Sequence, residues 1–184
     1  MKKAFLLAVT AMFCTAGFTS CLSDDDNDEL TWRTQNDQYM TEMQALLDDN
    51  NNPYFTKVVP DWNPNAYVLM HWHNDRNATR KNISPISTSY VDVKYHLRTI
   101  DGLAKDSSYM RTSPADSIYR TQLNSNIEGW IIALPEMHVG DSVTMVIPYQ
   151  FGYGSSQRGT IEAYSDLIFD VKLKGVPGYE TKPN

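Results

Sequence analysis

Two histidines separated by a single residue come closest to a metal site in this sequence. His71 and His73 would lie on one side of a strand, and Asp75 follows two residues later. A protein metal site usually takes three or four ligands, and no third ligand stands at a matching place, so we expect no metal. The sequence also lacks the G-x-S-x-G pattern of serine hydrolases, and residues 154–160 lack the lysine of a phosphate-binding loop.

Both cysteines lie in or beside an N-terminal targeting segment. Two lysines precede an almost unbroken apolar run over residues 4–13, which is typical of a secretory signal. Small residues and a Phe-Thr-Ser triplet then lead to Cys21, in a pattern that resembles the cleavage and lipidation motif of bacterial lipoproteins. We predict a signal peptide over residues 1–20, lipidation of Cys21 and a membrane anchor through that lipid. Cys14 leaves with the signal, so no thiol remains for catalysis or a disulfide.

An acidic run follows the predicted anchor. Residues 21–30 are predicted to be an extended tether, because closely spaced carboxylates stay solvated and repel one another. The run also resembles the acidic export signal of surface-exposed lipoproteins in some Gram-negative bacteria, and a spacer without an address is the alternative. We therefore expect an outer-membrane lipoprotein of the cell envelope that faces the periplasm or the cell surface.

The charge balance of the 184-residue chain argues against a nucleic-acid partner. Asp and Glu number 22 against 16 Lys and Arg, which gives a formal net charge of −6. Binding to phosphate backbones needs clustered basic residues. The length suits one domain with a sizeable core and a smaller additional section.

Hydrophobic spacing predicts that this additional section spans residues 31–85. A helix is expected to begin with a capping Thr31, and residues 66–72 are expected to form a strand. The apolar stripe of the helix includes Trp32, Tyr39, Met43 and Leu46. We interpret residues 31–85 as a helical appendage that packs on the main domain or pairs with a second copy, which would make a homodimer.

The main domain is predicted over residues 86–176, followed by a tail over residues 177–184. Apolar residues alternate with polar ones from Val91 to Leu97, and again over residues 143–147 and 167–173, which predicts half-buried strands. Residues 126–134 fit one short helix. This order predicts an α+β fold with a mainly antiparallel sheet.

Several ordered blocks of this domain resemble FKBP-type peptidyl-prolyl cis–trans isomerases. The first half of the family pattern is similar to V-D-V-K-Y at 91–95, D-G at 101–102 and D-S-S at 106–108. The second half is similar to I-E-G-W at 127–130, I-P-Y-Q-F-G-Y-G at 147–154 and L-I-F-D-V-K-L at 167–173. Blocks in matching order and spacing are more specific than any single motif.

The resemblance implies an FKBP-like antiparallel sheet wrapped around one short helix, with a proline pocket between them. It implies isomerisation of proline-containing segments of exported proteins, with no cofactor. It assigns catalytic roles to Asp106, Tyr153 and Trp130. It assigns substrate contacts to Tyr95, Ile127, Phe169, Arg111 and Lys105, with Arg111 as a basic partner of Asp106.

Three departures from the family pattern bear on activity. Lys105 stands where the family has a pocket Phe, Ser117 stands near the place of a second Phe, and Asn126 replaces a Val. Polar walls would admit water, so we predict weak isomerase activity. Two other functions remain open: a non-catalytic FKBP-like peptide-binding or chaperone lipoprotein, and a surface lipoprotein that binds glycans or host proteins through Trp62 and Trp72.

Overall fold

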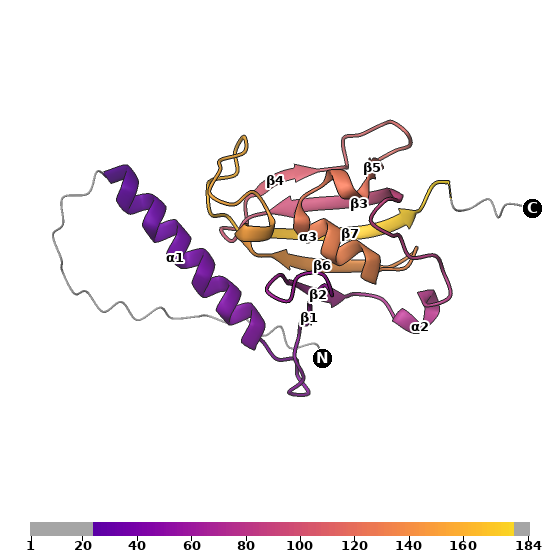
Figure 1. The fold of residues 1–184 in the computed structure, drawn as a ribbon, viewed down its shortest axis with the longest axis horizontal. Helices are drawn as coiled ribbons and strands as arrows, with labels where there is room; N and C mark the ends of the chain where they lie inside the picture. Colours follow the sequence, from indigo (N-terminus) through magenta and orange to yellow (C-terminus); the bar gives the residue numbers. More distant parts are fainter. Residues whose placement is uncertain (1–23, 179–184) are drawn as a thin grey trace, which may run out of the picture.

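The computed structural model describes residues 24–178 and shows one twisted sheet with helices against it (Figure 1). The strands are β1 (Thr56–Val58), β2 (Val68–Trp72), β3 (Tyr90–Arg98), β4 (Ala104–Ser107), β5 (Tyr119–Gln122), β6 (Ser142–Ile147) and β7 (Leu167–Gly175). The α-helices are α1 (Asp24–Ala45), α2 (Arg76–Thr79) and α3 (Glu128–Ala133). Single 3-10 turns are η1 (Leu123–Ser125), η2 (Leu134–Glu136) and η3 (Tyr149–Phe151). The predicted signal peptide, Cys21 and the end of the predicted tail lie outside the described residues.

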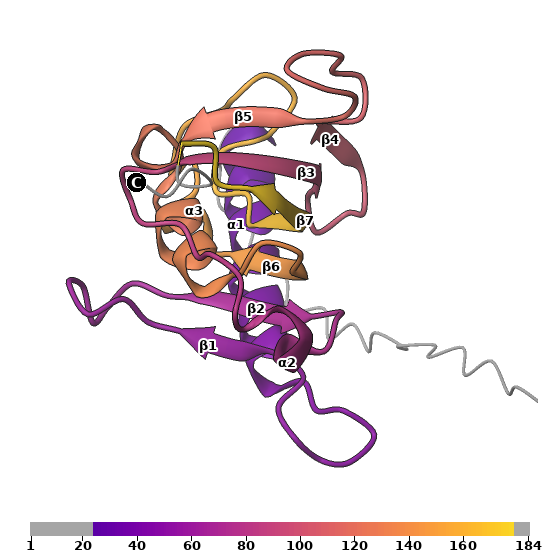
Figure 2. The same cartoon turned by 90° about the vertical axis from the view of Figure 1, so that its right-hand side faces the viewer.

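The strands form one antiparallel sheet in the order β1-β2-β6-β7-β3-β4, with β5 paired to the first half of β3. Figure 2 shows β1 and β2 at one edge and β4 and β5 at the other. The predicted α+β class with an antiparallel sheet is confirmed. Because β2 pairs with β6 through Leu69 and Val146, part of the predicted appendage extends the sheet of the main domain. The division of the chain into domains stays a prediction.

The two faces of the sheet carry different cores, as β6 shows. Met145 and Ile147 belong to the large cluster that includes Trp130 of α3. Val146 lies between them in the chain and belongs to the smaller cluster that includes Met40 of α1. Successive side chains of a strand point to opposite faces, so α3 and α1 cover opposite sides of the same sheet.

A glycine allows α3 to approach β6 closely. A Cβ atom at Gly129 would lie 2.3 Å from Cγ2 of Ile147, which no real packing tolerates. The glycine of the I-E-G-W block therefore brings the next residue, Trp130, down onto the sheet.

The acidic stretch at the start of the described chain is helical, so the prediction of an extended tether is wrong for residues 24–30. Helix α1 begins at Asp24, and Thr31 lies inside it rather than capping it: its hydroxyl donates to the carbonyl of Asn27 at 2.8 Å. Carboxylates near a helix N-terminus are favoured by the helix dipole. Once packing has formed the later turns, each added residue extends the helix at little cost.

The apolar stripe of α1 packs on the sheet of its own chain. Met40 is buried against Phe55, Leu69, Val146 and Ile168, and Tyr39 and Met43 pack at the margin of this cluster. Leu46 was predicted to share the stripe, but its side chain is 39% exposed, because α1 ends at Ala45.

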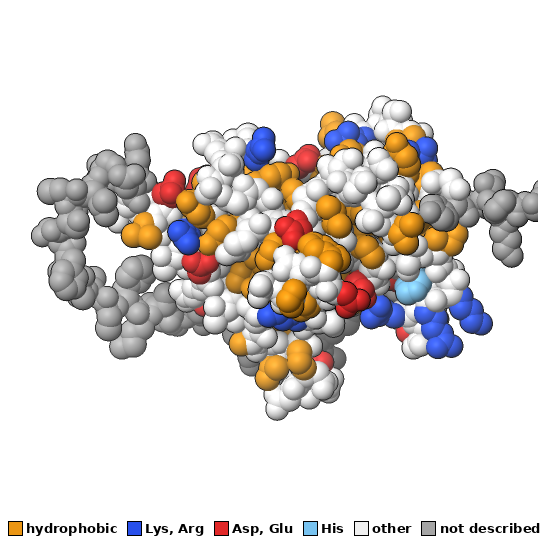
Figure 3. All heavy atoms as spheres, viewed as in Figure 1, with side chains coloured by type: hydrophobic (Ala, Val, Ile, Leu, Met, Phe, Trp, Pro, Cys, Tyr) orange, Lys and Arg blue, Asp and Glu red, His pale blue; other side chains and the backbone are white. Residues whose placement is uncertain are grey.

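The surface in Figure 3 shows basic side chains gathered beside α2, where Arg76, Arg80 and Lys81 are exposed. Within residues 24–178, no helix has both the length and the apolar character needed to cross a membrane.

Candidate active site

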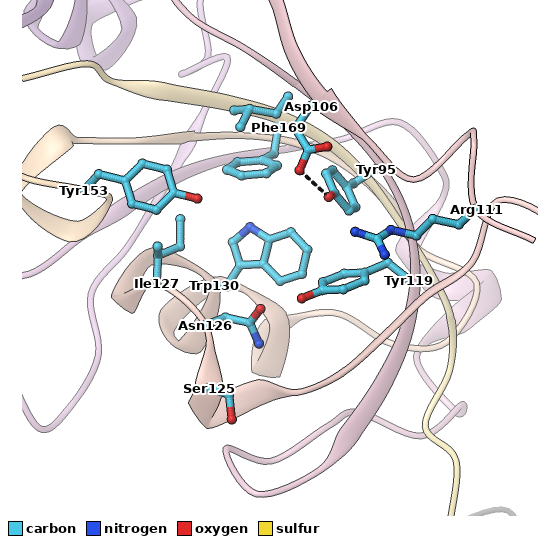
Figure 4. A pocket seen from close by; sticks show the side chains of 11 residues that line it. Tyr95, Asp106, Arg111, Tyr119, Ser125, Asn126, Ile127, Trp130, Tyr153 and Phe169 are labelled. Atoms are coloured by element: carbon cyan, nitrogen blue, oxygen red, sulfur yellow. Dashed lines mark hydrogen bonds between the residues drawn. The ribbon is translucent and has the colours of Figure 1, made fainter. Parts of the chain in front are cut away.

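A cavity of about 290 Å³ opens between α3 and the sheet. Figure 4 shows side chains from several separate segments converging on the ring of Trp130. The cavity is lined by Tyr95, Leu97, Asp106, Arg111, Tyr119, Ser125, Asn126, Ile127, Trp130, Tyr153 and Phe169. Every residue that was given a catalytic or substrate-contact role lies around this one cavity except Lys105.

Trp130 forms the centre of an aromatic cluster at the base of the cavity. Its ring meets Phe169 at a centroid distance of 5.3 Å and Tyr95 at 5.6 Å, both nearly edge-to-face, which is a favoured geometry for aromatic pairs. The residue is only 3% exposed. Its Nε1 is buried and has no hydrogen-bond partner within the described residues. An unpaired buried donor is rare, and the indole N–H of Trp130 lies beside the cavity.

Ile127 places a second unpaired donor at the cavity. It is the N-cap residue of α3, with extended backbone, and its carbonyl accepts from the amide of Trp130 at 3.0 Å. Its own amide N–H has no backbone partner in the described part of the chain. The first N–H groups of a helix are left free by the helical pattern itself, so this amide can donate to a bound carbonyl group.

Tyr95 and Asp106 join the sheet side of the cavity. The Tyr95 hydroxyl donates to Oδ2 of Asp106 at 2.6 Å (Figure 4). Burial, and then this carboxylate, raise the pKa of Tyr95 well above its usual value, while Arg111 opposes the rise. The hydroxyl therefore keeps its proton at neutral pH and holds the carboxylate in one orientation.

Arg111 lies on the same side but does not take its predicted partner. Its guanidinium carbon lies 4.5 Å from the ring centroid of Tyr119. Among the ion pairs of residues 24–178, none joins Arg111 to Asp106. A delocalised guanidinium stacks well on an aromatic face, and the charge still faces the cavity.

Tyr153 closes the opposite side of the cavity. Figure 4 shows its hydroxyl directed into the space above Trp130. Burial, followed by the negative charge of Asp106, raises the pKa of Tyr153. The hydroxyl is therefore a donor at neutral pH.

The cavity thus combines an apolar base with unpaired donors at its margin. Such a site suits a compact apolar group that is flanked by carbonyl oxygens. A proline residue within a peptide chain has this chemistry.

Comparison with known proteins agrees with this geometry. A family model described as FKBP-type peptidyl-prolyl cis-trans isomerase matches residues 81–174. This chain belongs to that family. The FK506-binding protein 1A of Aspergillus fumigatus is 34% identical over 97 residues, which cover 50% of this chain and 81% of that protein. The FKBP-type 22 kDa peptidyl-prolyl cis-trans isomerase of Escherichia coli is 39% identical over 90 residues, which cover 48% and 42% of the two chains.

Solved structures share the fold over most of the chain. The crystal structure of FkpA from Escherichia coli has a TM-score of 0.64 at 22% identity and covers 82% of this chain and 62% of that one. A peptidyl-prolyl cis-trans isomerase from Pseudomonas syringae has a TM-score of 0.59 at 24% identity, covering 80% and 94%. The chain spans 42% of the length of the 22 kDa relative and 57% of FK506-binding protein 2 of Aspergillus oryzae.

Lys105, which the family resemblance places at a wall of the pocket, is not among the residues that line the cavity. In the pairing of β3 with β4, Leu97 faces Asp106 and Arg98 faces Ala104, which leaves Lys105 as the extra residue of a bulge. Its ammonium lies 3.9 Å from a carboxylate oxygen of Asp101. A bulge re-aims the side chain at the inserted position, and sequence spacing alone did not reveal it.

Other departures from the FKBP pattern have different outcomes. Ser117 does not line the cavity, while Tyr119 does. The pairing of Tyr119 with Val93 on β3 turns its ring toward Trp130. The alternation of side chains along β5 is the sequence signal that could have placed the Tyr119 ring on this face.

Asn126 does line the cavity, as its place beside Ile127 suggested. Its Nδ2 donates to the carbonyls of Gln122 at 2.7 Å and Leu123 at 3.1 Å, which fixes the amide. Its Oδ1 is turned toward the cavity (Figure 4). Ser125 and Leu97 also line the cavity and were not predicted to do so.

The remaining candidate residues lie away from the cavity. His71 contacts the Tyr54 carbonyl through Nδ1 at 2.8 Å, and His73 contacts the Thr144 hydroxyl through Nε2 at 2.8 Å. Among the described residues, no three His, Cys, Asp or Glu side chains gather closely enough to hold a metal. Trp62 is 59% exposed, whereas the ring of Trp72 is half-buried and covered by Arg76 at 4.1 Å. The two tryptophans do not share an exposed aromatic surface.

Proposed function

We propose that this protein is a peptidyl-prolyl cis–trans isomerase acting on proline-containing segments of exported proteins. The observation that carries the proposal is the cavity over Trp130, which has an apolar base and unpaired donors at its margin. The family supports the same reaction.

The reaction needs no broken bond, only rotation about the Xaa–Pro amide against a barrier of ~18–20 kcal/mol. The planar amide is the more polar form, so an apolar site over Trp130 favours the twisted amide. The Ile127 amide and the Tyr153 hydroxyl donate to carbonyls on either side of the proline and hold the chain in place. Asp106 lies beside the rotating bond. Catalysis then comes from stronger binding of the twisted state than of either planar state.

The expected strength of catalysis rises now that Lys105 and Ser117 lie outside the cavity. Of the three polar departures, only Asn126 lines it, and Tyr119 adds an aromatic wall.

A peptide isomerisation assay with short Phe-Pro and Leu-Pro substrates tests the proposal. Trp130→Ala should reduce kcat/KM to the uncatalysed background, while the exposed Trp62→Ala should leave it unchanged. Binding of these peptides by wild type without any acceleration would favour the non-catalytic peptide-binding protein instead.

We also propose that the protein is an exported lipoprotein of the outer membrane, anchored through Cys21. The support is the signal-like sequence that ends at Cys21, together with the lack of cysteine after it. Cys21→Ala should yield an unlipidated soluble product or an unprocessed precursor, while Cys14→Ala should behave as wild type. Membrane partitioning of a processed Cys21→Ala protein would exclude Cys21 as the anchor.

We also propose that the protein forms a homodimer. The apolar stripe of α1 is used within the chain, so a dimer would need another surface, and Leu46 and Leu47 are exposed at the end of the helix. Sedimentation analysis of wild type and of Leu47→Ser tests this surface.

A further inference from the structure

We propose that α1 is a positioning element of the candidate active site, in which Asn36 and Trp32 hold the loop that carries Tyr153. This loop spans residues 149–166, between β6 and β7. The inference rests on the proposed function, because it treats Tyr153 as a group that binds substrate.

Asn36 is a polar residue buried where α1 meets the sheet. It is 0% exposed. Its Nδ2 donates to the carbonyl of Trp32 at 2.8 Å, and its Oδ1 accepts from the backbone N–H of Asp166 at 2.7 Å. The first bond fixes the amide, since a carbonyl can only accept. Burying an amide group costs free energy unless its hydrogen bonds are made, and an apolar side chain would fill this place without that cost. What the asparagine adds is the bond to the loop.

Trp32 holds the same end of the loop one turn earlier in the helix. Its Nε1 donates to Oγ of Ser165 at 3.0 Å, and this hydroxyl in turn donates to the carbonyl of Glu162 at 2.8 Å. Arg33 lies over the ring of Tyr164 at 5.0 Å. Three neighbouring residues of the loop are thus contacted from one side of α1.

Hydrogen bonds continue from this end of the loop to the residue beside Tyr153. Oδ1 of Asp166 accepts from the amide of Tyr149 at 2.9 Å, and the carbonyl of Tyr149 accepts from the amide of Gly154 at 2.8 Å. The carbonyl of Gly154 accepts from the amide of Tyr164 at 2.9 Å. Gly154, which follows Tyr153 directly, therefore makes two backbone hydrogen bonds that connect it to the residues contacted by α1.

The placement of Tyr153 depends on this backbone. Its hydroxyl is directed into the cavity (Figure 4), and among residues 24–178 no side-chain hydrogen bond fixes it there. A donor must be placed within a fraction of an ångström to act on a reacting group. Loosening the loop should therefore weaken the action of Tyr153 while the aromatic base stays intact.

Three variants of α1 in the full chain, in detergent, separate positioning from stability. Asn36→Leu fills the same buried space with an apolar side chain and removes the hydrogen bond to the loop. We expect kcat/KM to fall by about threefold to tenfold. Met40→Leu is the matched control, because Met40 is buried in the same helix and packs in the apolar cluster on the sheet. It should stay within twofold of wild type. Trp32→Phe, which removes the indole N–H together with part of the ring, should show a smaller drop than Asn36→Leu.

The decisive readout is the same substitution in a Tyr153→Phe background. If α1 acts through the Tyr153 hydroxyl, Asn36→Leu should then cost less than twofold. An equal loss with and without that hydroxyl would overturn the proposal. Amide hydrogen exchange over residues 149–166 gives a reading independent of activity: it should accelerate in Asn36→Leu and not in Met40→Leu. If wild type is inactive but shows this exchange pattern, the isomerase proposal is rejected while the proposal that α1 positions the loop stands. If exchange over residues 149–166 is the same in Asn36→Leu as in wild type, the proposal that α1 positions the loop is rejected.

Discussion

The two faces of the sheet use their buried polar groups in opposite ways. On the α1 face, Asn36 bonds at both ends of its amide, and the indole N–H of Trp32 is paired with Ser165. On the α3 face, the indole N–H of Trp130 has no partner, and the cavity lies beside it. The same strands support both arrangements. Buried polar groups are normally satisfied, so the unpaired indole N–H of Trp130 beside the cavity is available to a ligand.

Asp166 is the exception on the α1 face. One of its carboxylate oxygens accepts from Tyr149, while the other is buried without a partner in the described residues. It lies at the point where α1, the loop over residues 149–166 and β7 meet.

The largest effect that we expect comes from closing the gap between α3 and β6. Gly129→Ala places a Cβ atom 2.3 Å from Ile147, so α3 must move away and carry Trp130 with it. We expect a loss of about 3 kcal/mol in the free energy of unfolding, together with loss of peptide binding. Chemical denaturation measures the first and fluorescence titration the second. The penalty should shrink in an Ile147→Ala background, and an undiminished penalty there would show that the contact is not its cause.

A smaller effect compares equal truncations on the two faces. Val143 and Val146 are both fully buried on β6, the first in the α3 core and the second in the α1 cluster. The cost of a cavity depends on how far its surroundings can collapse, and a single helix lying on a sheet can shift more readily than the enclosed core. Val143→Ala should cost about 2 kcal/mol and Val146→Ala about 1 kcal/mol by denaturation. The reverse order would mean that α1 is the more rigid layer.

The third effect, the smallest when it is counted per unit of pH, is a pH dependence that belongs to the α1 face. Burial, with a lesser contribution from the charge of Asp37, raises the pKa of Asp166 to about 7. An unfolded Asp titrates near 3.9, so between these values the folded state holds a proton that the unfolded state lacks. The free energy of unfolding should therefore fall as the pH rises from about 4 to about 7, by roughly 1 kcal/mol per unit at most.

Asp166→Asn is the matched variant for this pH dependence. It cannot ionise, and its amide oxygen can still accept from Tyr149. Denaturation curves between pH 5 and pH 8 should show that most of the slope has disappeared and that the variant exceeds wild type in stability at the upper end. A slope that survives in Asp166→Asn would assign it to other groups.

Much of the α3 face could be predicted from the sequence, because its signals are local. Alternation from Val91 to Leu97 marks β3, and the I-E-G-W block places Trp130 on a short helix. These patterns depend on the two-residue period of a strand and on short spacings within one element. Family resemblance supplied the rest of the cavity, including Tyr153 and Phe169.

The tertiary structure decided what depends on contacts between distant segments. Lys105 is the extra residue of a bulge in the pairing of β3 with β4 and does not line the cavity, and Arg111 lies over the ring of Tyr119. Asn36 lies 130 residues before Asp166 in the chain, and nothing in its own helix indicates that it bonds there. The sequence by itself determined the fold class and the strands β2, β3, β6 and β7, because these follow from local periodicity, whereas the aromatic base came from the family resemblance. Which polar groups are paired and which face an open cavity depends on long-range packing, which local patterns do not encode.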